Sequence, residues 1–478
     1  MPRGRRLLLL DQGSHASKAW LAGEDGAWLG SGEAALDSLA PEPDRREHDP
    51  PALLASVRTA LEAAMGRAAA GTPDVTAGIA TQRSSIVCWD RQTGEALSPV
   101  ISWQDRRSAA WLDALGLDPE QVRRITGLVP SPHYGASKLR WCLDHLPAVG
   151  RARRAGRLCM GPLSSYLLFS LLEEHPFVVD PANASRTLLW DVGTGTWSTA
   201  MLERFGIPAE CLPRCVPSRY GFGTLPVAGA RVPVEVCTGD QAAALFAGGR
   251  PRPDTLYVNI GTGAFVQRPA DGEPPPVPGL LQSVAWQEGD ESLAVLEGTV
   301  NGAGAALDWL AGHLGMPVEQ LLGQAGRWLA ERHDAPLFIN GVGGLGSPFW
   351  KPGCPVRFEG EGEENAAART VAVVESIAFL VQANAEAMEA ALGPARRIVV
   401  TGGLAVLDGL CRRLAELGGI PVERPARREA TAAGLAWLLG LPDAGAPSPP
   451  DVFEPERPGP VSRRYAAWKT AITRVAGA

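Results

Sequence analysis

Two stretches with the same pattern constrain the fold of this chain more than any other feature. Residues 7–22 and 256–267 each read as a strand, a turn rich in Gly and hydroxyl residues, and a second strand. One stretch opens each half of the chain, which predicts two related domains that face one cleft. The length agrees, because 478 residues exceed what one hydrophobic core usually serves.

The stretch 236–246, between these two hairpins, predicts a carboxylate at the mouth of a sheet. Residues 233–237 are apolar and strand-like, and a run of small residues after Asp240 reads as a helix. Ligands of α/β proteins bind at such strand-to-helix turns. Because Asp is also a preferred N-cap residue, capping of the helix is the competing interpretation of Asp240. The rest of the chain favours catalysis.

The turns of the predicted hairpins could bind phosphate. Backbone N–H groups and hydroxyls near Gly13 and Ser14 are suitable donors, and Asp11 at the strand end could hold hydrated magnesium. An ordinary hairpin is the alternative. The Gly-rich residues 341–346 lack the Lys-Ser/Thr that completes a P-loop. Gly402 and Gly403 follow a strand, and allow either flat packing of a base or only tight strand-to-helix packing.

Polar residues at other predicted strand ends are candidates for binding hydroxyl groups. Arg83 follows the strand 75–80, and Trp103, Gln104 and Asp105 follow another short strand. For Arg83 and Asp105, surface salt bridging is about equally expected.

Charge and composition exclude some functions and favour a small-molecule partner. The net charge is −7 and the pI is near 5.7, which argues against binding of nucleic acid or anionic membranes. The basic N-terminus has only four Leu residues before Asp11, too few for a signal peptide, and no run of about 18 uncharged apolar residues follows. The eight scattered cysteines read as buried thiols, so we expect a cytoplasmic protein without a thiolate metal site.

Apolar residues at helical spacing, with start and stop signals, predict three longer helices at 51–70, 301–314 and 370–392. The Pro-rich run 442–460 is expected to end the compact part. A short docked helix is expected at 465–468.

These segments, taken in order, make the chain resemble the FGGY carbohydrate kinase family, and its glycerol-kinase-like branch in particular. The resemblance runs from about Leu7 to Trp468. It is carried by the following segments: Asp11-Gln12-Gly13-Ser14, residues 79–83 with 87–90, Trp103-Gln104-Asp105-Arg106-Arg107, Ser137-Lys138-Leu139-Arg140-Trp141, Gly239-Asp240-Gln241, Gly261-Thr262-Gly263 and Gly402-Gly403.

The resemblance implies an α/β fold with two actin/hexokinase-like (ribonuclease H-like) domains facing a nucleotide cleft. Residues 1–248 would bind the substrate, and residues 249–478, with the Pro-rich tail, would bind the nucleotide. ATP and Mg²⁺ are implied, with Asp240 as catalytic base and Asp11 and Asp240 near the metal. The implied substrate contacts are Arg83, Ser84, Trp103, Gln104, Asp105, His133, Tyr134, Gln241 and Phe265. The implied nucleotide contacts are Asp11, Gly13, Ser14, Lys18, Gly261, Thr262, Gly304, Asp308, Gly402, Gly403 and Leu407.

Three departures from glycerol kinases leave the substrate open. Ser84 stands where they carry Glu after the Arg that grips glycerol, His133 stands at their Tyr position, and Leu407 replaces the Asn after the Gly pair. A longer polyol or a ketose is at least as expected as glycerol. A sugar sensor or a nucleotide-switch protein of the same fold is the alternative function, and a homodimer or homotetramer is possible.

Overall fold

The computed structural model forms two compact units, which are described separately here. The structure describes residues 4–66, 74–331, 335–360, 365–426, 429–441, 449–456 and 459–477. The first unit comprises Met1–Pro251, Ser283–Ala294 and Glu429–Pro447, and the second comprises Arg252–Gln282, Val295–Arg428 and Ser448–Ala478. The predicted boundary between residues 248 and 249 stays a prediction, and two segments beyond it belong to the first unit.

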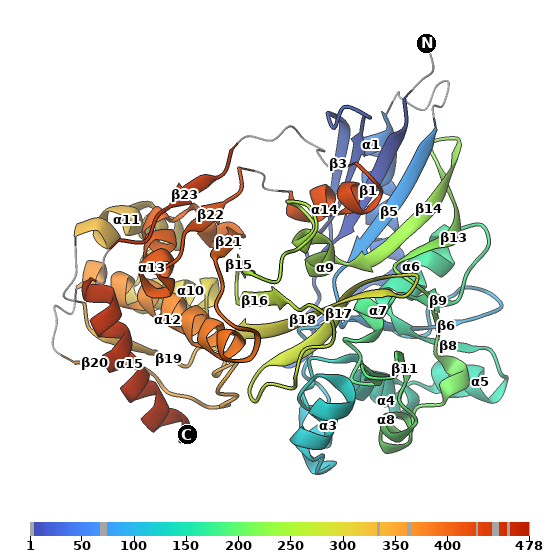
Figure 1. The fold of residues 1–478 in the computed structure, drawn as a ribbon. Coiled ribbons are helices and arrows are strands. Elements are labelled where there is room, and N and C mark those ends of the chain that lie inside the picture. Colours follow the sequence, from blue (N-terminus) through green and yellow to red (C-terminus); the bar gives the residue numbers. More distant parts are fainter. Residues whose placement is uncertain are drawn as a thin grey trace. The chain divides into compact units, whose positions relative to one another are not determined.

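The first unit is built on a six-stranded sheet with the order β13-β14-β5-β1-β2-β3 (Figure 1). The strands are β1 (Arg6–Gln12), β2 (Ala16–Ala22), β3 (Trp28–Ala35), β5 (Val75–Thr81), β13 (Arg219–Val227) and β14 (Ala230–Gly239). The three central strands, β14, β5 and β1, are parallel, and hairpins extend the sheet on both sides. The carboxyl ends of three strands therefore meet at one edge, where α/β sheets bind ligands.

Helices cover this sheet, and a smaller sheet completes the unit. The four-stranded sheet has the order β4-β7-β6-β8, with β4 (Glu47–His48), β6 (Ile86–Asp90), β7 (Val100–Ile101) and β8 (Leu158–Pro162). Short strand pairs are β9 (Val178–Val179) with β12 (Arg214–Cys215), and β10 (Trp190–Asp191) with β11 (Thr196–Trp197). The helices are α1 (Pro50–Met65), α2 (Ala109–Ala114), α3 (Pro119–Thr126), α4 (Gly135–His145), α5 (Pro147–Arg154), α6 (Leu163–Leu171), α7 (Pro181–Ala184), α8 (Thr199–Phe205), α9 (Asp240–Leu245), α14 (Ala430–Leu438) and the 3₁₀ turn η2 (Ala209–Cys211).

The second unit contains most of a seven-stranded sheet with the order β17-β18-β16-β15-β21-β22-β23. Residues 283–294, which include most of β17 and the start of β18, belong to the first unit. The strands are β15 (Thr255–Ile260), β16 (Ala264–Pro269), β17 (Leu281–Glu288), β18 (Glu291–Val300), β21 (Arg397–Thr401), β22 (Val422–Arg424) and β23 (Asp451–Phe453). A two-stranded sheet pairs β19 (Leu337–Asn340) with β20 (Val356–Glu359). The helices are α10 (Gly304–Leu314), α11 (Val318–Glu331), α12 (Ala366–Leu392), α13 (Asp408–Gly418), α15 (Pro460–Ala476) and the 3₁₀ turn η3 (Gly403–Val406).

Helix α12 is the core helix of the second unit. It is the one helix of the described chain that is long and apolar enough to span a membrane, but 83% of its most apolar window is buried within the structure. Its buried Glu375 pairs with Arg413 of α13 at 3.1 Å and with Arg464 of α15 at 2.7 Å. Two guanidinium groups offset the desolvation of this carboxylate, so the ion pairs join three helices.

Most expected elements form, with shifted ends. Both predicted hairpins are present as β1 with β2 and as β15 with β16. The helix expected at 51–70 ends at Met65, because Gly66 takes a positive φ of 47°, and residues 67–70 lie outside the described residues. The helix expected at 301–314 begins at Gly304, and the one at 370–392 begins four residues earlier.

The C-terminal end differs more from its prediction. Helix α15 extends over 17 residues rather than the predicted four, and buries Trp468 completely. Residues 442–448 and 457–458 of the predicted Pro-rich tail lie outside the described residues.

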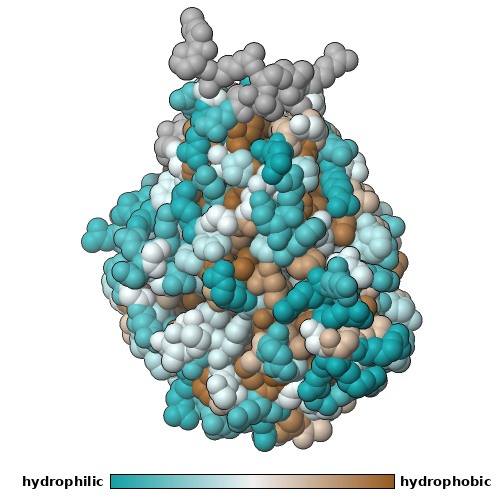
Figure 2. All heavy atoms as spheres, turned by 90° about the vertical axis from the view of Figure 1, so that its right-hand side faces the viewer, coloured by the Kyte–Doolittle hydropathy of each residue, from teal (hydrophilic) through white to brown (hydrophobic). Residues whose placement is uncertain are grey.

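The eight cysteines are free thiols, and all but Cys215 are buried, as the sequence predicts. Figure 2 shows one face of the molecule, where small hydrophobic areas are interrupted by hydrophilic residues. Such a mixture is ordinary for a protein surface.

Candidate active site

The parallel strands of the first unit bring Asp11 and Asp240 to one edge of the sheet. Asp11 lies near the end of β1, opposite Ala80 of β5. Asp240 follows β14 directly, and its neighbour Gly239 lies opposite Thr81 of β5. The two acidic residues therefore flank the end of the same central strand. At this short range, the charge of Asp240 raises the pKa of Asp11.

Asp240 is the first residue of α9, and Gly239 is the N-cap residue. Asp240 is therefore not the N-cap residue itself, but its carboxylate binds an N–H of the first turn of α9. The Asp240 carboxylate accepts a hydrogen bond from the N–H of Gln241 at 2.7 Å. Burial raises the pKa of Asp240, and the charges of Arg83 and Arg186 partly oppose this effect. A carboxylate with a raised pKa is a better proton acceptor than a solvated one.

Asp11 has a strongly perturbed environment. Burial and, to a smaller extent, the charge of Asp240 raise the pKa of Asp11 to about 7. A side-chain hydrogen bond with Thr431 and the charge of Lys18 lower this pKa. Carboxylate oxygens close to each other are the donor set that Mg²⁺ prefers. A divalent cation would relieve the repulsion that raises this pKa, so the residues present fit the metal.

The turn between β1 and β2 is tied to the neighbouring loops by side-chain hydrogen bonds. The Ser14 hydroxyl lies 3.2 Å from the side-chain oxygen of Gln82 and accepts a 2.9 Å bond from the indole N–H of Trp103. Gln82 also donates to Gln12 at 3.2 Å and accepts from Ser85 at 3.0 Å. The predicted phosphate turn and the predicted substrate residue Trp103 therefore belong to one polar network.

Arg83 reaches from the end of β5 to the start of α9, where it donates to the side-chain oxygen of Gln241. Gly239 makes this path possible, since a Cβ there would lie 2.5 Å from Cδ and 2.6 Å from Cγ of Arg83. Arg83 and Gln241, both predicted substrate contacts, thus lie beside Asp240. Ser84 follows with a positive φ of 65°, which is uncommon for a residue other than Gly.

His133 and Tyr134 line the same region from the start of α4. The His133 ring lies 5.4 Å from the Trp103 ring and 5.1 Å from the Tyr134 ring. Burial is the main cause that holds the pKa of His133 well below its usual value, and the charges of Arg186 and Lys138 add to this effect. His133 is therefore neutral near pH 7 and can both donate and accept one hydrogen bond.

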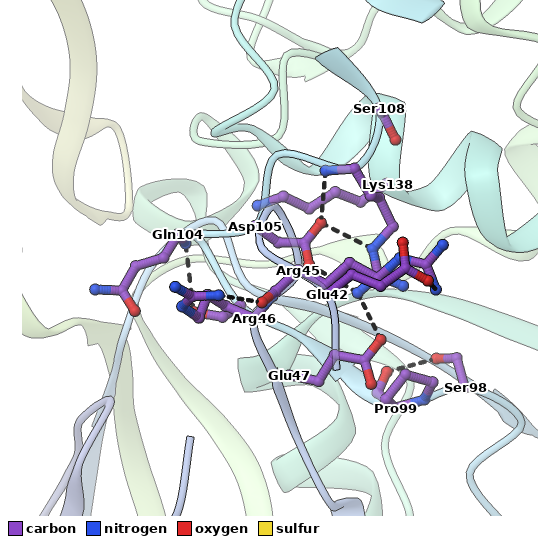
Figure 3. A network of polar contacts seen from close by, with 12 residues as sticks. Glu42, Arg45, Arg46, Glu47, Ser98, Pro99, Gln104, Asp105, Ser108 and Lys138 are labelled. Atoms are coloured by element: carbon purple, nitrogen blue, oxygen red, sulfur yellow. Dashed lines mark hydrogen bonds and ion pairs between the residues drawn. The ribbon is translucent and has the colours of Figure 1, made fainter. Parts of the chain in front are cut away.

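Asp105 and Gln104 point in different directions. Asp105 is fully buried and accepts bonds from the Arg46 N–H at 2.7 Å and from Arg107 at 2.8 Å and 2.7 Å, as Figure 3 shows. Arg107 also pairs with Glu47 at 2.5 Å. These contacts support a structural role for Asp105 and leave its predicted contact with a hydroxyl without support. The amide of Gln104 points away from this network (Figure 3).

In the second unit, the predicted phosphate turn and the start of α10 form one piece of backbone. The N–H of Gly304 donates to the Gly261 carbonyl at 2.9 Å, and the N–H of Ala305 donates to Thr262 at 2.9 Å. A Cβ on Gly304 would lie 2.8 Å from the Gly261 oxygen. The structure thus places three predicted nucleotide residues, Gly261, Thr262 and Gly304, together at the start of α10, where the N–H groups of Gly304 and Ala305 already donate to the turn.

The Gly402-Gly403 turn follows β21 next to β15. Gly402 has a φ of 93°, and a Cβ there would lie 2.6 Å from the Ile260 oxygen. Gly402 therefore packs closely against the end of strand β15, whereas the sequence suggested packing of a strand against a helix. Both glycines are exposed. Leu407 is buried in the core of this unit.

The remaining predicted residues lie apart from these turns or at their edges. Asp308 is exposed on α10, one turn after Gly304. Phe265 is half-buried on β16, opposite Asn259 and Thr299. Lys18 lies opposite Asp11 in the β1–β2 hairpin and forms an ion pair with Glu33 at 3.7 Å.

Helix α14, which begins about 190 residues after Asp240 in the chain, was not expected from the sequence. Thr431, its second residue, lies near Asp11 and lowers the pKa of that carboxyl. Gly434 packs against α9 so closely that a Cβ would overlap the carbonyl oxygen of Ala243. The small residues at 430–434 are a signal for close helix packing, but nothing in the sequence tells which helix they contact.

Comparison with known proteins decides the family. Residues 7–247 match the N-terminal domain, and residues 256–441 the C-terminal domain, of the FGGY family of carbohydrate kinases. The chain belongs to the FGGY family. It is an ATP-dependent carbohydrate kinase, and the sensor or nucleotide-switch alternative is not favoured.

Curated relatives agree over nearly the whole chain. A glycerol kinase of Trichlorobacter lovleyi is 37% identical over 453 residues, covering 91% of this chain and 89% of the relative. A glycerol kinase of Thermus brockianus is 36% identical, covering 98% of each chain.

Solved structures show the FGGY fold. The structure of Plasmodium falciparum glycerol kinase with ADP has a TM-score of 0.89 at 21% identity, covering 99% of this chain and 98% of that chain. A xylulose kinase of Rhodospirillum rubrum has a TM-score of 0.87 at 20% identity, covering 99% of both chains. The predicted fold class, two actin/hexokinase-like domains, is confirmed.

Proposed function

We propose that this FGGY kinase transfers the γ-phosphate of ATP to a hydroxyl of glycerol or of a closely related polyol, with Asp240 as the general base. The observation that carries the proposal is the juxtaposition of Asp240, Arg83 and Gln241 at the end of β5 and β14. Relatives named glycerol kinase, at 32–37% identity, support glycerol as the first acceptor to test.

In this mechanism, Asp240 accepts the proton of the attacking hydroxyl. Arg83 keeps the carboxylate ionised and orients Gln241, which can accept a hydrogen bond from another hydroxyl of the substrate. Trp103, His133 and Tyr134 provide an aromatic and polar wall with a neutral imidazole. Phosphoryl transfer depends mostly on positioning and on stabilisation of charge.

We propose that ATP contacts the backbone N–H groups and hydroxyls near Gly13 and Ser14 of the first unit. In the second unit, ATP contacts the backbone N–H groups and the hydroxyl near Gly261, Thr262 and Gly304. Gly402 and Gly403 offer a surface without side chains to the base. Asp11 and Asp240 would hold Mg²⁺, which supplies positive charge for the phosphate oxygens. Thr431, which lies near Asp11 and lowers its pKa, would orient this carboxylate.

The replacement at Ser84 leaves the acceptor pocket without the carboxylate expected in glycerol kinases, so the choice among polyols is part of the proposal. A pocket that lacks a hydrogen-bonding partner discriminates strongly among substrates. We also place the reaction in the cytoplasm, since eight free thiols fit a reducing compartment.

The proposal is tested by measuring ADP release with Mg²⁺ and ATP in the presence of glycerol, erythritol, ribitol, arabitol, xylulose and ribulose. We expect glycerol or one polyol to raise ADP release well above the rate without acceptor, with a phosphorylated product detected by mass spectrometry. Release that no acceptor stimulates would overturn the proposed function.

The pH dependence follows from the environment of Asp240. Only the ionised carboxylate accepts a proton, so kcat/KM should fall as the pH falls through its raised pKa, at a higher pH than for a solvated Asp. A positive charge lowers the pKa of a nearby carboxyl, so Arg186→Met should move this acid limb to higher pH. The profile is measured for both proteins at saturating ATP. An unmoved limb would show that another group controls it.

A further inference from the structure

Lys138 is a buried cation for which the proposed mechanism has no role. It lies in α4, in a segment that resembles a family signature, and its side chain has no solvent exposure. Its ammonium group donates to the backbone carbonyl of His133 at 2.6 Å and to the backbone carbonyl of Ser84 at 3.2 Å. Burial of an amino group is costly. A buried Lys that donates hydrogen bonds only to two backbone carbonyls therefore needs a structural or functional reason.

The two carbonyls belong to the two segments that carry the predicted acceptor contacts. Ser84 directly follows Arg83, and His133 directly precedes Tyr134. These segments lie about 50 residues apart in the chain, and Lys138 joins them through one atom.

Ser84 has the unusual conformation that such a bond can stabilise. Its φ of 65° is in the left-handed region, which costs energy for a residue with a Cβ. Its hydroxyl donates to the Arg186 carbonyl at 3.2 Å, and the Lys138 ammonium binds its carbonyl. The two bonds fix both the side chain and the peptide that follows it.

The charges around Lys138 are mixed. Burial lowers its pKa to about 7, while the charge of Asp105 opposes this effect and that of Arg107 adds to it. Asp105 itself bonds to Arg107 and to the Arg46 N–H (Figure 3). Among the described residues, the ammonium of Lys138 donates to the Ser84 and His133 carbonyls and does not bond to Asp105.

We infer that Lys138 is a positioning residue for the acceptor: its bonds to the Ser84 and His133 carbonyls hold Ser84 in the left-handed conformation and set the spacing of the two segments that contact the substrate. This inference rests on the proposed function. It predicts that Lys138 affects acceptor binding and has little effect on ATP.

The test combines Lys138→Met with Ser84→Gly. Met has nearly the same length but no donors, so the KM for the acceptor should rise about 10- to 100-fold while the KM for ATP changes less than about twofold. Gly adopts a positive φ without strain. The comparison uses Ser84→Gly alone as its reference. Lys138→Met should raise the acceptor KM roughly tenfold less in the Ser84→Gly background than in the wild-type background. If Lys138→Met does not fold, Lys138→Leu, which also has no donors, provides the same comparison with and without Ser84→Gly.

Arg268→Met is the matched control. Arg268 is a buried cation of the second unit that also donates to backbone carbonyls, those of Pro253 at 2.8 Å and Gly393 at 2.6 Å. It should lower the thermal midpoint without a selective change in the acceptor KM. An acceptor KM that Lys138→Met leaves unchanged, or a defect that Ser84→Gly does not relieve, would overturn the inference. Absence of turnover by the wild type on every acceptor would instead overturn the proposed function.

Discussion

Replacing Asp240 with Asn is expected to lower kcat by about 10²–10⁴-fold, the range that general-base catalysis contributes. The amide keeps the size of the carboxylate and can still accept the 2.7 Å bond from the Gln241 N–H. It cannot take up a proton, however, and it offers Mg²⁺ no charge. The fold should be unchanged, because the buried carboxylate has a raised pKa and gains little from its ionised form. Acceptor-stimulated ADP release at saturating substrates measures the effect.

Asp191→Asn is the matched control for this variant. Asp191 also accepts bonds from backbone N–H groups after a strand, those of Gly193 and Thr194, both at 3.0 Å, but it lies in a turn of the first unit without a buried partner charge. Its replacement should leave kcat within about twofold, as is usual for surface sites. Acceptor-dependent turnover that Asp240→Asn leaves near the wild-type level would remove Asp240 from the role of base.

The parts of the site that lie at strand ends could be predicted from the sequence. Asp11, Arg83 and Asp240 each follow an apolar run, and parallel strands place such residues at one sheet edge. The structure brings these three residues together through the pairing of β1, β5 and β14. Local sequence was sufficient here, because the position of each residue depends on its own strand.

The direction in which the side chains of these loop residues point could not be predicted from the sequence. Asp105 follows a strand as Arg83 does, yet its carboxylate turns inward to Arg107 and to the Arg46 N–H. One of these partners, Arg46, comes from a segment about 60 residues earlier, whose position depends on the packing of β4 against β7. The same holds for Thr431, since only the tertiary fold brings α14 to Asp11. Contacts between distant segments leave no periodic signal in the chain.

Replacing Gly434 with Ala is expected to be the most damaging single-methyl change in the first unit. A Cβ at this position would overlap the Ala243 oxygen and lie 2.6 Å from the Ala243 carbonyl carbon. These are backbone atoms of α9, so the helix must move rather than a side chain. Overpacking of this kind costs about 1–3 kcal/mol. Because α9 begins at Asp240 and α14 carries Thr431, we expect both a lower thermal midpoint and a kcat reduced at least about tenfold.

Gly312→Ala in α10 separates this clash from the general effect of Ala in a helix. A Cβ on Gly312 meets no atom within 4 Å, so this variant should gain about 0.5–1 kcal/mol of stability from helix propensity. Thermal unfolding and kcat, measured side by side, check both variants. A Gly434→Ala protein with wild-type stability and activity would mean that α14 can move away from α9 at no cost. Thr431 could then not hold Asp11 in place, and the link that α14 makes between the metal-binding carboxylate and the helix of the base would be lost.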